Sequence, residues 1–267
     1  MNRDKDFHRF ALCVEYCGSE FSGWQRQRNA PSVQQTLEMA LSKLDPGRPT
    51  VTGAGRTDSG VHATGQVAHV DLERRWNPFR LREAANAKLR PASIAVLKVS
   101  EVDRQFSART SAVMREYRYK ITNRRAPRAV GFKLAWHVRS RLDCGAMMNG
   151  ARRLTGKHDF TTFRAAQCQA HSPVKTLEGI EIHTVELPFG SEIAITFRAR
   201  SFLHRQVRSI VGTLVKVGEG AWRPEEVTVA LKARSRDACG PVAPAHGLYL
   251  SNVKYRPDPF DRDFRNG

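Results

Sequence analysis

The residues best suited to chemistry lie in a glycine-rich stretch, residues 53 to 60, which reads GAGRTDSG. Gly53, Gly55 and Gly60 allow positive φ angles and close approach of a ligand to the backbone. Arg56 can hold a phosphate through two parallel hydrogen bonds. Asp58 has the chemistry of a nucleophile, a base or a metal ligand, and the structural alternative is an Asx-turn closed by its own carboxylate. The stretch has neither the Gly-Lys-Ser/Thr ending of a P-loop nor the spacing of a dinucleotide fingerprint.

The charge of the chain points to a polyanionic partner. Among 267 residues, 44 Lys plus Arg stand against 26 Asp plus Glu, which gives a net charge of +18 and a pI near 10.4. Such an excess favours nucleic acid first and an anionic membrane second, and a solvated basic surface is the alternative. Basic residues crowd between positions 104 and 128, where Glu116 is the one acid, and this density favours a phosphate track. They are Arg104, Arg109, Arg115, Arg118, Lys120, Arg124, Arg125 and Arg128.

Several classes of protein are disfavoured. No stretch approaches the roughly 20 apolar residues of a membrane span, and the N-terminus carries no hydrophobic signal core, so we expect a cytoplasmic protein without a membrane partner. The five cysteines are scattered and form neither a disulfide framework nor a zinc quartet. Cys168 and His171 have the spacing of half a metal site, but no second pair accompanies them, and we predict no metal.

The elements that must position these residues follow from periodicity. In the first part of the chain, apolar alternation and helix caps predict the order β-α-β-β-α-β. The expected elements are a strand over residues 10–16, a helix over 33–44 capped by Ser32, strands over 50–53 and 66–71, a helix from Pro78 to Leu89, and a strand over 94–102.

A similar order recurs further along. We expect a strand over 113–121, helices over 142–154 and 202–217, strands over 176–186 and 192–200, a short helix over 225–233 and a last strand over 248–255. The prediction is an α+β protein of two tandem ferredoxin-like (βαββαβ) domains, residues 1–104 and 105–267, with mainly antiparallel sheets. The basic cluster begins at their junction, where we expect an active-site cleft.

Six blocks of the sequence resemble, in content and order, those of the tRNA pseudouridine synthase A family. The most specific reads RTDSGVHA at residues 56–63, and the set spans the chain from about residue 10 to residue 255. The others read GWQRQ at 23–27, FSAR at 106–109, REYRY at 115–119, HDFTTFR at 158–164, and the segment 202–212.

This resemblance implies a cofactor-free isomerase, usually a homodimer, that acts on the anticodon arm of tRNA. It would convert uridine to pseudouridine at positions 38, 39 and 40 by detaching the uracil from N1, turning it, and reattaching it through C5. Neither a metal nor a cofactor is implied. The first domain would carry the catalytic aspartate loop, and the second would supply an arginine that pairs with the aspartate and a tyrosine that stacks on the base.

By motif match, Asp58 is the catalytic carboxylate, which either attacks the ribose at C1′ or acts as a base toward C2′ to give a glycal. Arg208 matches its basic partner, with a solvated helix face as the alternative. Tyr117 matches the tyrosine that stacks on the target base, where its hydroxyl can also assist removal of the C5 proton. Tyr119 lies on the same strand face and is expected in the core. Arg56 would fill the space, or bind the phosphates, that become available when the nucleotide flips.

Other matched segments imply contacts with tRNA. They are Phe106, Ser107, Ala108, Arg109 and Thr110, then Arg125, and Gln167, Cys168 and Gln169 in the loop 165–171. Trp24 and Gln25 fit the rim of the pocket, and a place in the hydrophobic core is the alternative for Trp24. The chain departs from the family pattern at Ser59, Arg205 and Gln206, and the last of these puts the packing of its helix in doubt.

Two other functions fit parts of the sequence. A non-catalytic RNA-binding or chaperone protein with tandem ferredoxin-like units accounts for charge and fold, but not for an aspartate between glycines on a phosphate-friendly bend. A thiol-dependent uracil-modifying enzyme would use Cys168 to add to C6, but no environment that lowers the thiol pKa is visible.

Overall fold

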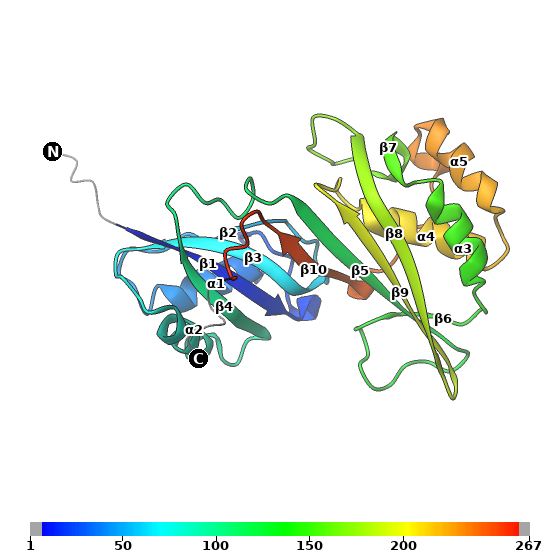
Figure 1. The fold of residues 1–267 in the computed structure, drawn as a ribbon. Coiled ribbons are helices and arrows are strands. Elements are labelled where there is room, and N and C mark those ends of the chain that lie inside the picture. Colours follow the sequence, from blue (N-terminus) through cyan, green and yellow to red (C-terminus); the bar gives the residue numbers. More distant parts are fainter. Residues whose placement is uncertain (1–6, 262–267) are drawn as a thin grey trace. The chain divides into compact units, whose positions relative to one another are not determined.

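The computed structural model describes residues 7–261, and the chain divides into two compact units (Figure 1). The first unit runs to Val113 and takes up the chain again from Leu250, and the second is Met114–Tyr249. The fold is α+β, with a large mixed and mainly antiparallel sheet. Each unit is described by itself below.

The first unit places β1 at the centre of its strands, antiparallel to β3 on one side and to β4 on the other. The two-residue β2 pairs with the opposite edge of β3, where Thr52 lies across from His69. The glycine-rich stretch therefore begins at the end of β2 and leads into β3. The elements are β1 (His8–Tyr16), α1 (Val33–Leu41), β2 (Thr52–Gly53), β3 (His62–Leu72), α2 (Pro78–Leu89) and β4 (Ile94–Val102).

Both helices of this unit begin at the predicted caps. The Ser32 hydroxyl accepts a hydrogen bond from the Gln35 backbone N–H at 3.3 Å, and the Asn77 side chain accepts one from Arg80 N–H at 3.2 Å. Such caps satisfy backbone donors that a helix N-terminus leaves unpaired. Leu37 and Leu41 of α1 are buried, so the predicted apolar stripe forms part of the core.

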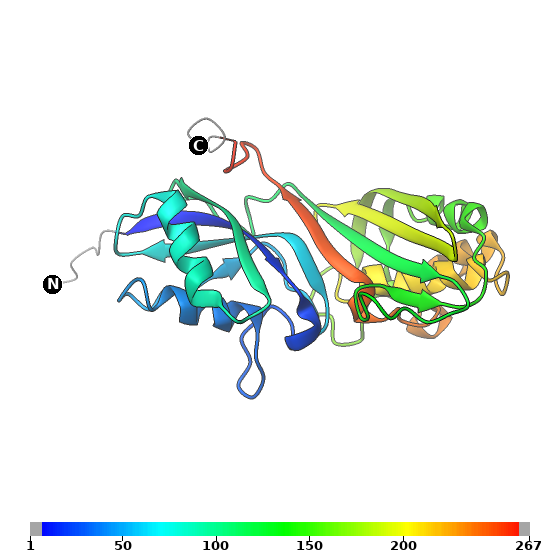
Figure 2. The same cartoon turned by 90° about the horizontal axis from the view of Figure 1, so that it is seen from below.

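The second unit contains β5 (Met114–Asn123), β6 (Trp136–Val138), α3 (Cys144–Arg152), β7 (Gly156–Asp159), β8 (Val174–Leu187), β9 (Gly190–Ala199), α4 (Gln206–Gly218) and α5 (Pro224–Ala233), and it ends within β10 (Leu248–Lys254). Its strands run in the order β5, β9, β8, β7, all antiparallel, while β6 pairs with β5 in parallel. The helices pack together on one side of these strands (Figures 1 and 2). Short 3₁₀ turns occur at Gly18–Glu20, Thr161–Phe163, Arg236–Ala238 and Ala245–Gly247.

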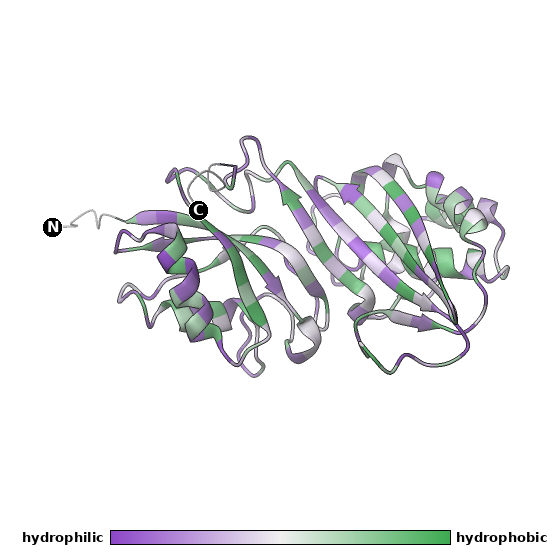
Figure 3. Ribbon diagram, turned by 60° about the horizontal axis from the view of Figure 1, so that its bottom comes forward, coloured by the Kyte–Doolittle hydropathy of each residue, from purple (hydrophilic) through white to green (hydrophobic). Residues whose placement is uncertain are grey.

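Alternation along β5 separates the core from solvent. Tyr117, Tyr119 and Ile121 are buried, while Arg118 and Lys120 between them are exposed, as the two-residue period of a strand requires. Figure 3 shows the same alternation of hydrophobic and hydrophilic bands along the strands of this unit. Tyr119 is fully buried and its hydroxyl donates to the Pro244 carbonyl O at 2.8 Å, which confirms its predicted place in the core.

The predicted helices and longer strands are present, with ends that differ by a few residues. β6 and β7 were not predicted, because three or four residues give too little alternation to be recognised. The division of the chain also differs from the predicted 104/105 boundary, since residues 105–113 and the end of β10 group with the first unit.

Contacts of Tyr255 explain this grouping. Its hydroxyl donates to the Ala108 carbonyl O at 2.7 Å, and its ring lies 5.2 Å from that of Phe106. Nearby, the Val113 N–H donates to the Lys254 carbonyl O at 2.9 Å. The segment after β4 and the segment after β10 therefore hold each other in place.

Candidate active site

The loop that carries Asp58 is fixed at the residue before it. The Thr57 carbonyl O accepts a hydrogen bond from Trp24 N–H at 3.1 Å, and the Thr57 hydroxyl lies 2.8 Å from the Tyr16 hydroxyl in a buried pair. Further back along the loop, the Gly55 carbonyl O accepts from the buried Gln66 side chain at 2.8 Å. The backbone on the N-terminal side of Asp58 is thus held by β1, β3 and the segment around Trp24.

A tight turn fixes the other side. The Val61 N–H donates to the Asp58 carbonyl O at 3.1 Å, and Gly60 has a φ of +78°. This places Gly60 at the third position of a β-turn of type II, which requires a positive φ there. The Gly60 N–H also donates to the Phe21 carbonyl O at 3.3 Å. Asp58 therefore opens a turn that is anchored by backbone bonds.

Two glycines allow the surrounding segments to pack without side chains. Gly23 has a φ of +96°, and a Cβ there would lie 2.5 Å from the Thr57 carbonyl O. At Gly53, a Cβ would lie 2.5 Å from the Trp24 ring. Trp24 is 3% exposed and contacts the Tyr16 ring, so it belongs to the core beneath the loop, while Gln25 is exposed.

The loop presents its polar side chains to different degrees. Arg56 and Ser59 are exposed, whereas Asp58 is half-buried. A half-buried carboxylate on a fixed turn is partly shielded from water and has a defined direction. Both properties suit a group that reacts with a bound substrate.

In the second unit, Tyr117 lies near the start of β5 with 8% of its surface exposed. Its ring forms a T-shaped contact with the Phe202 ring, with a centroid distance of 5.1 Å and an interplanar angle of 88°. The aromatic residue is thus held in a fixed orientation by a neighbouring ring.

Arg208 lies in the first turn of α4, half-buried, and its Nε donates to the Ala243 carbonyl O at 2.8 Å. Burial raises the pKa of the Tyr119 hydroxyl, and the positive charge of Arg208 nearby opposes that rise. Arg208 is therefore a fixed cation beside the interior of the unit, not a residue on a solvated helix face.

The two departures next to Arg208 have structural roles. Arg205 adopts a positive φ of 60° just before α4 begins. Gln206 is fully buried, and its side-chain oxygen accepts from the Leu203 N–H at 2.8 Å. The Gln206 side chain therefore ties the segment before α4 to the first residue of the helix.

The residues predicted to contact tRNA fall into two groups. Arg109, Thr110, Arg125, Gln167 and Gln169 are exposed. Phe106, Ser107 and Cys168 are half-buried, and Ala108 is fully buried, with its N–H donating to His69 Nδ1 at 3.1 Å. The five exposed residues are therefore the ones whose side chains remain candidates for direct contact with tRNA.

His69 makes the stability of this segment sensitive to pH. Burial, and then the charge of Arg9, lower the pKa of His69, while Asp71 opposes them. Below about pH 6.5 the unfolded chain binds a proton that the folded chain does not, so stability falls as pH drops from about 7 toward 5. We expect a lower Tm at about pH 5.5 than at pH 7.5. The decrease in Tm should be smaller in His69→Asn, because the asparagine oxygen can accept the same hydrogen bond without titrating. An equal decrease in the variant would mean that other groups cause the pH dependence.

Within residues 7–261, no group of three or more His, Cys, Asp or Glu side chains is placed to hold a metal ion. No helix in that range is long and apolar enough to cross a membrane. The five cysteines are unpaired with one another.

Comparison with known proteins identifies the family. The family model for tRNA pseudouridine synthase matches residues 12–110 and 151–256, which include both Asp58 and Arg208. The chain belongs to the tRNA pseudouridine synthase family. The resemblance seen in the sequence is thereby confirmed. Tyr117 lies in the segment between the two matched ranges.

Curated relatives cover nearly the whole chain. A tRNA pseudouridine synthase A of Dinoroseobacter shibae is 57% identical over 252 residues, which is 94% of this chain and 98% of the relative. That of Ruegeria sp. is 55% identical over 251 residues, 94% and 96% of the two chains. That of Paracoccus denitrificans is 56% identical over 255 residues, 94% and 98%.

Proposed function

We propose that this protein converts uridine to pseudouridine at positions 38, 39 and 40 of the tRNA anticodon stem-loop, as a cytosolic homodimer. Membership of the family, by a match that includes the Asp58 loop, is the observation that carries this function. The net charge of +18 suits a polyanionic substrate. The order of elements β1, α1, β2, β3, α2, β4 supports a ferredoxin-like fold for the first unit, and the antiparallel strands with α3 and α4 support one for the second.

Asp58 acts on the ribose of the target uridine. Its carboxylate either attacks C1′, which displaces the uracil at N1, or removes a proton from C2′ to give a glycal. In both routes the freed uracil turns and bonds through C5 to C1′. This step displaces the Asp58 carboxylate from C1′ in the first route and is accompanied by return of the proton to C2′ in the second. C5 then loses its proton and N1 gains one. The reaction is an isomerisation and consumes no other reactant.

Arg208 and Tyr117 serve the same uridine. Arg208 would pair with the Asp58 carboxylate through charge-assisted hydrogen bonds and so orient it toward the ribose. The Tyr117 ring stacks on the everted base, and the T-shaped contact with Phe202 holds that ring in place. Arg56 is exposed. When the nucleotide flips, Arg56 would either fill the space that the base leaves or bind the neighbouring phosphates.

The role of Tyr117 can be separated into ring and hydroxyl. Stacking on aromatic side chains contributes about 1–3 kcal/mol per base, so we expect Tyr117→Leu to lower single-turnover rates by about 10- to 100-fold. Tyr117→Phe should keep the rate within about threefold if the ring alone acts. A loss in Tyr117→Phe as large as that in Tyr117→Leu would instead give the hydroxyl a role in removing the C5 proton.

The function itself is tested with unmodified tRNA transcript. After incubation with the protein, carbodiimide-reactive pseudouridine should be present at positions 38, 39 or 40 of substrates that carry uridine there. Binding without product would favour the non-catalytic RNA-binding alternative.

A further inference from the structure

Glu38 on α1 is a buried carboxylate outside the residues assigned so far. Its side chain is 5% exposed, and among residues 7–261 the only other buried acid is Asp45, at 1%. Taking a carboxylate out of water is costly unless it is paired and hydrogen-bonded. A buried acid at this position therefore needs partners whose bonds offset the loss of hydration.

Both oxygens of the Glu38 carboxylate are engaged. Oε1 accepts hydrogen bonds from the Val51 N–H at 2.9 Å and from the Gln34 side-chain amide at 3.0 Å. Oε2 pairs with the Arg26 guanidinium. Gln34 lies one turn earlier on α1, and its own side-chain oxygen accepts from the Arg26 N–H at 3.1 Å. Gln34 and Glu38 together hold Arg26 by its backbone and its side chain, and Glu38 holds Val51 as well.

The two segments that Glu38 joins are those that support the Asp58 loop. Val51 immediately precedes β2, which leads into the loop. Arg26 lies two residues after Trp24, whose N–H donates to the Thr57 carbonyl O at 3.1 Å. One carboxylate thus connects the segment that enters the loop to the segment that bonds the residue before Asp58.

Strand pairing does not supply this connection. β2 is two residues long and pairs with β3 only at Thr52 and Gly53. Val51 lies outside that pairing, and its N–H bonds Glu38 instead. A hydrogen bond to an ionised acceptor is roughly twice as strong as one between neutral groups. Because the loop that follows is rich in glycine, which gives the backbone wide conformational freedom, a fixed point at its entry restricts it.

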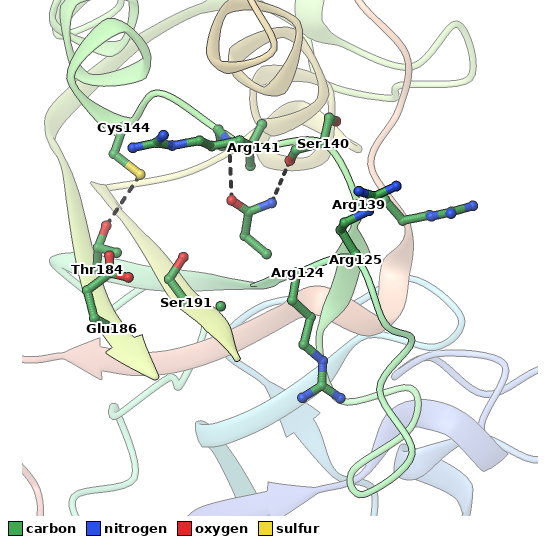
Figure 4. A pocket seen from close by; sticks show the side chains of 12 residues that line it. Arg124, Arg125, Arg139, Ser140, Arg141, Cys144, Thr184, Glu186 and Ser191 are labelled. Carbon is green, nitrogen blue, oxygen red and sulfur yellow. Dashed lines mark hydrogen bonds between the residues drawn. The ribbon is translucent and has the colours of Figure 1, made fainter. Parts of the chain in front are cut away.

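Another buried polar side chain joins two segments in the second unit. Asn123 is 9% exposed, and its Nδ2 donates to the carbonyl O atoms of Val138 at 2.9 Å and Ser140 at 2.6 Å. Figure 4 shows the segment that these bonds hold, from Arg139 to Arg141. A neutral amide is therefore enough to join backbone segments in this protein. Glu38 differs because one of its partners is a guanidinium.

Asp45, which follows α1, gives a matched comparison. Its Oδ1 accepts from the Gly47 N–H at 3.1 Å, and its Oδ2 accepts from the Arg74 N–H at 3.0 Å. These bonds join the turn after α1 to the segment after β3, and not the two segments that support Asp58. Asp45 is thus as buried as Glu38 and bonded through both oxygens, but in a different place.

We propose that Glu38 is a positioning residue for the reaction: through Val51 and Arg26 it fixes the loop that presents Asp58 to the ribose. Displacing a reacting group by about 1 Å can lower a rate about 100-fold, so a small shift of the loop is enough to affect the chemistry. The affinity for tRNA depends mostly on phosphate contacts and should change little. This inference rests on the proposed function, because it takes Asp58 to be the reacting carboxylate.

The test compares two carboxylate-to-amide substitutions. Glu38→Gln keeps an oxygen for the Val51 N–H but turns an N–H₂ group toward the Arg26 guanidinium. Asp45→Asn likewise keeps one acceptor and loses the other. Both variants should lower Tm, by about 3–8 °C.

Activity should separate the two variants when both are assayed well below their Tm. For Glu38→Gln we expect kcat at saturating unmodified tRNA to fall about 10- to 100-fold, while the Kd for tRNA stays within about threefold. For Asp45→Asn we expect kcat within about twofold of wild type. A loss of kcat that appears in one variant only, at a similar loss of Tm, is not an effect of stability.

Gln34→Ala tests the same network at a half-buried position. It removes the bonds to the Arg26 N–H and to Glu38 but leaves the Glu38 carboxylate paired with the Arg26 guanidinium. We expect kcat to fall about 3- to 10-fold, with Tm within about 2 °C of wild type, because alanine favours the helix. Combined with Glu38→Gln, the two losses should be less than multiplicative, since both substitutions break one network.

Three results would overturn the proposal. The first is an unchanged kcat in Glu38→Gln, or in Gln34→Ala if Glu38→Gln does not fold. The second is a loss of kcat in Asp45→Asn as large as that in Glu38→Gln. The third is a rise in the Kd for tRNA that accounts for the whole loss of activity. Failure of the proposed function is distinct, because wild-type protein would then bind tRNA without forming pseudouridine.

Discussion

Replacing Asp58 with asparagine should lower pseudouridine formation by about 10⁴-fold or more, while the Kd for tRNA stays within about threefold. An amide has the size of the carboxylate but neither its nucleophilicity nor its basicity, and removing a group that bonds to the reacting centre has effects of this order. The fold should be unaffected, because the turn is held by backbone bonds from Val61 to Asp58 and from Gly60 to Phe21. Single-turnover product formation and filter binding measure the two quantities.

Ser59→Ala is the matched control. Ser59 is exposed, and its hydroxyl donates a long 3.4 Å hydrogen bond to the Phe21 carbonyl O, so we expect activity within about threefold of wild type. If Asp58→Asn retained activity near that of Ser59→Ala, Asp58 would have no part in the chemistry.

Gly23→Ala should damage both stability and catalysis without touching the substrate. The residue has a φ of +96°, and the added Cβ would lie 2.5 Å from the Thr57 carbonyl O. Left-handed backbone costs a non-glycine residue about 1–2 kcal/mol, and the clash adds to it, so the free energy of unfolding should fall by about 3 kcal/mol or more. Because Thr57 precedes Asp58, its displacement should also lower kcat by about 100-fold, as a shift near 1 Å can do.

Gly220→Ala is the control, because it introduces backbone strain at a positive φ without a steric clash. Gly220 has a φ of +74°, but a Cβ there would meet no atom within 4 Å. Thermal unfolding should show a small loss of Tm and normal activity for this variant. Equal effects of the two substitutions would mean that contact with Thr57 is not what positions Asp58.

Much of the fold follows from local patterns in the sequence. Ser32 and Asn77 mark helix starts because their side chains bond backbone N–H groups that have no partner within the helix itself. Tyr119 is recognisable as core because strand alternation places it beside Ile121 on the inner face of β5. The residue types of the Asp58 loop were compatible with both a reactive carboxylate and an Asx-turn, and the motif blocks led to the family that the comparisons confirm.

The remainder depends on contacts distant in sequence. Nothing local indicates that Tyr255 would bond the Ala108 carbonyl and join residues 105–113 to the first unit. Ala108, expected to contact tRNA, is fully buried in that segment. The role of Glu38 escaped notice because only the fold brings the Val51 N–H to its carboxylate.

The most direct test of the account is a structure of the Asp58→Asn protein with unmodified tRNA bound. We predict that a uridine at position 38, 39 or 40 is everted, with the substituted side chain at position 58 within about 3.5 Å of its C1′ or C2′ atom and the Tyr117 ring stacked on its base. The atom that lies nearer would indicate the route. A bound tRNA whose uridines at these positions stay in the stem-loop, far from residue 58, would contradict the central claim.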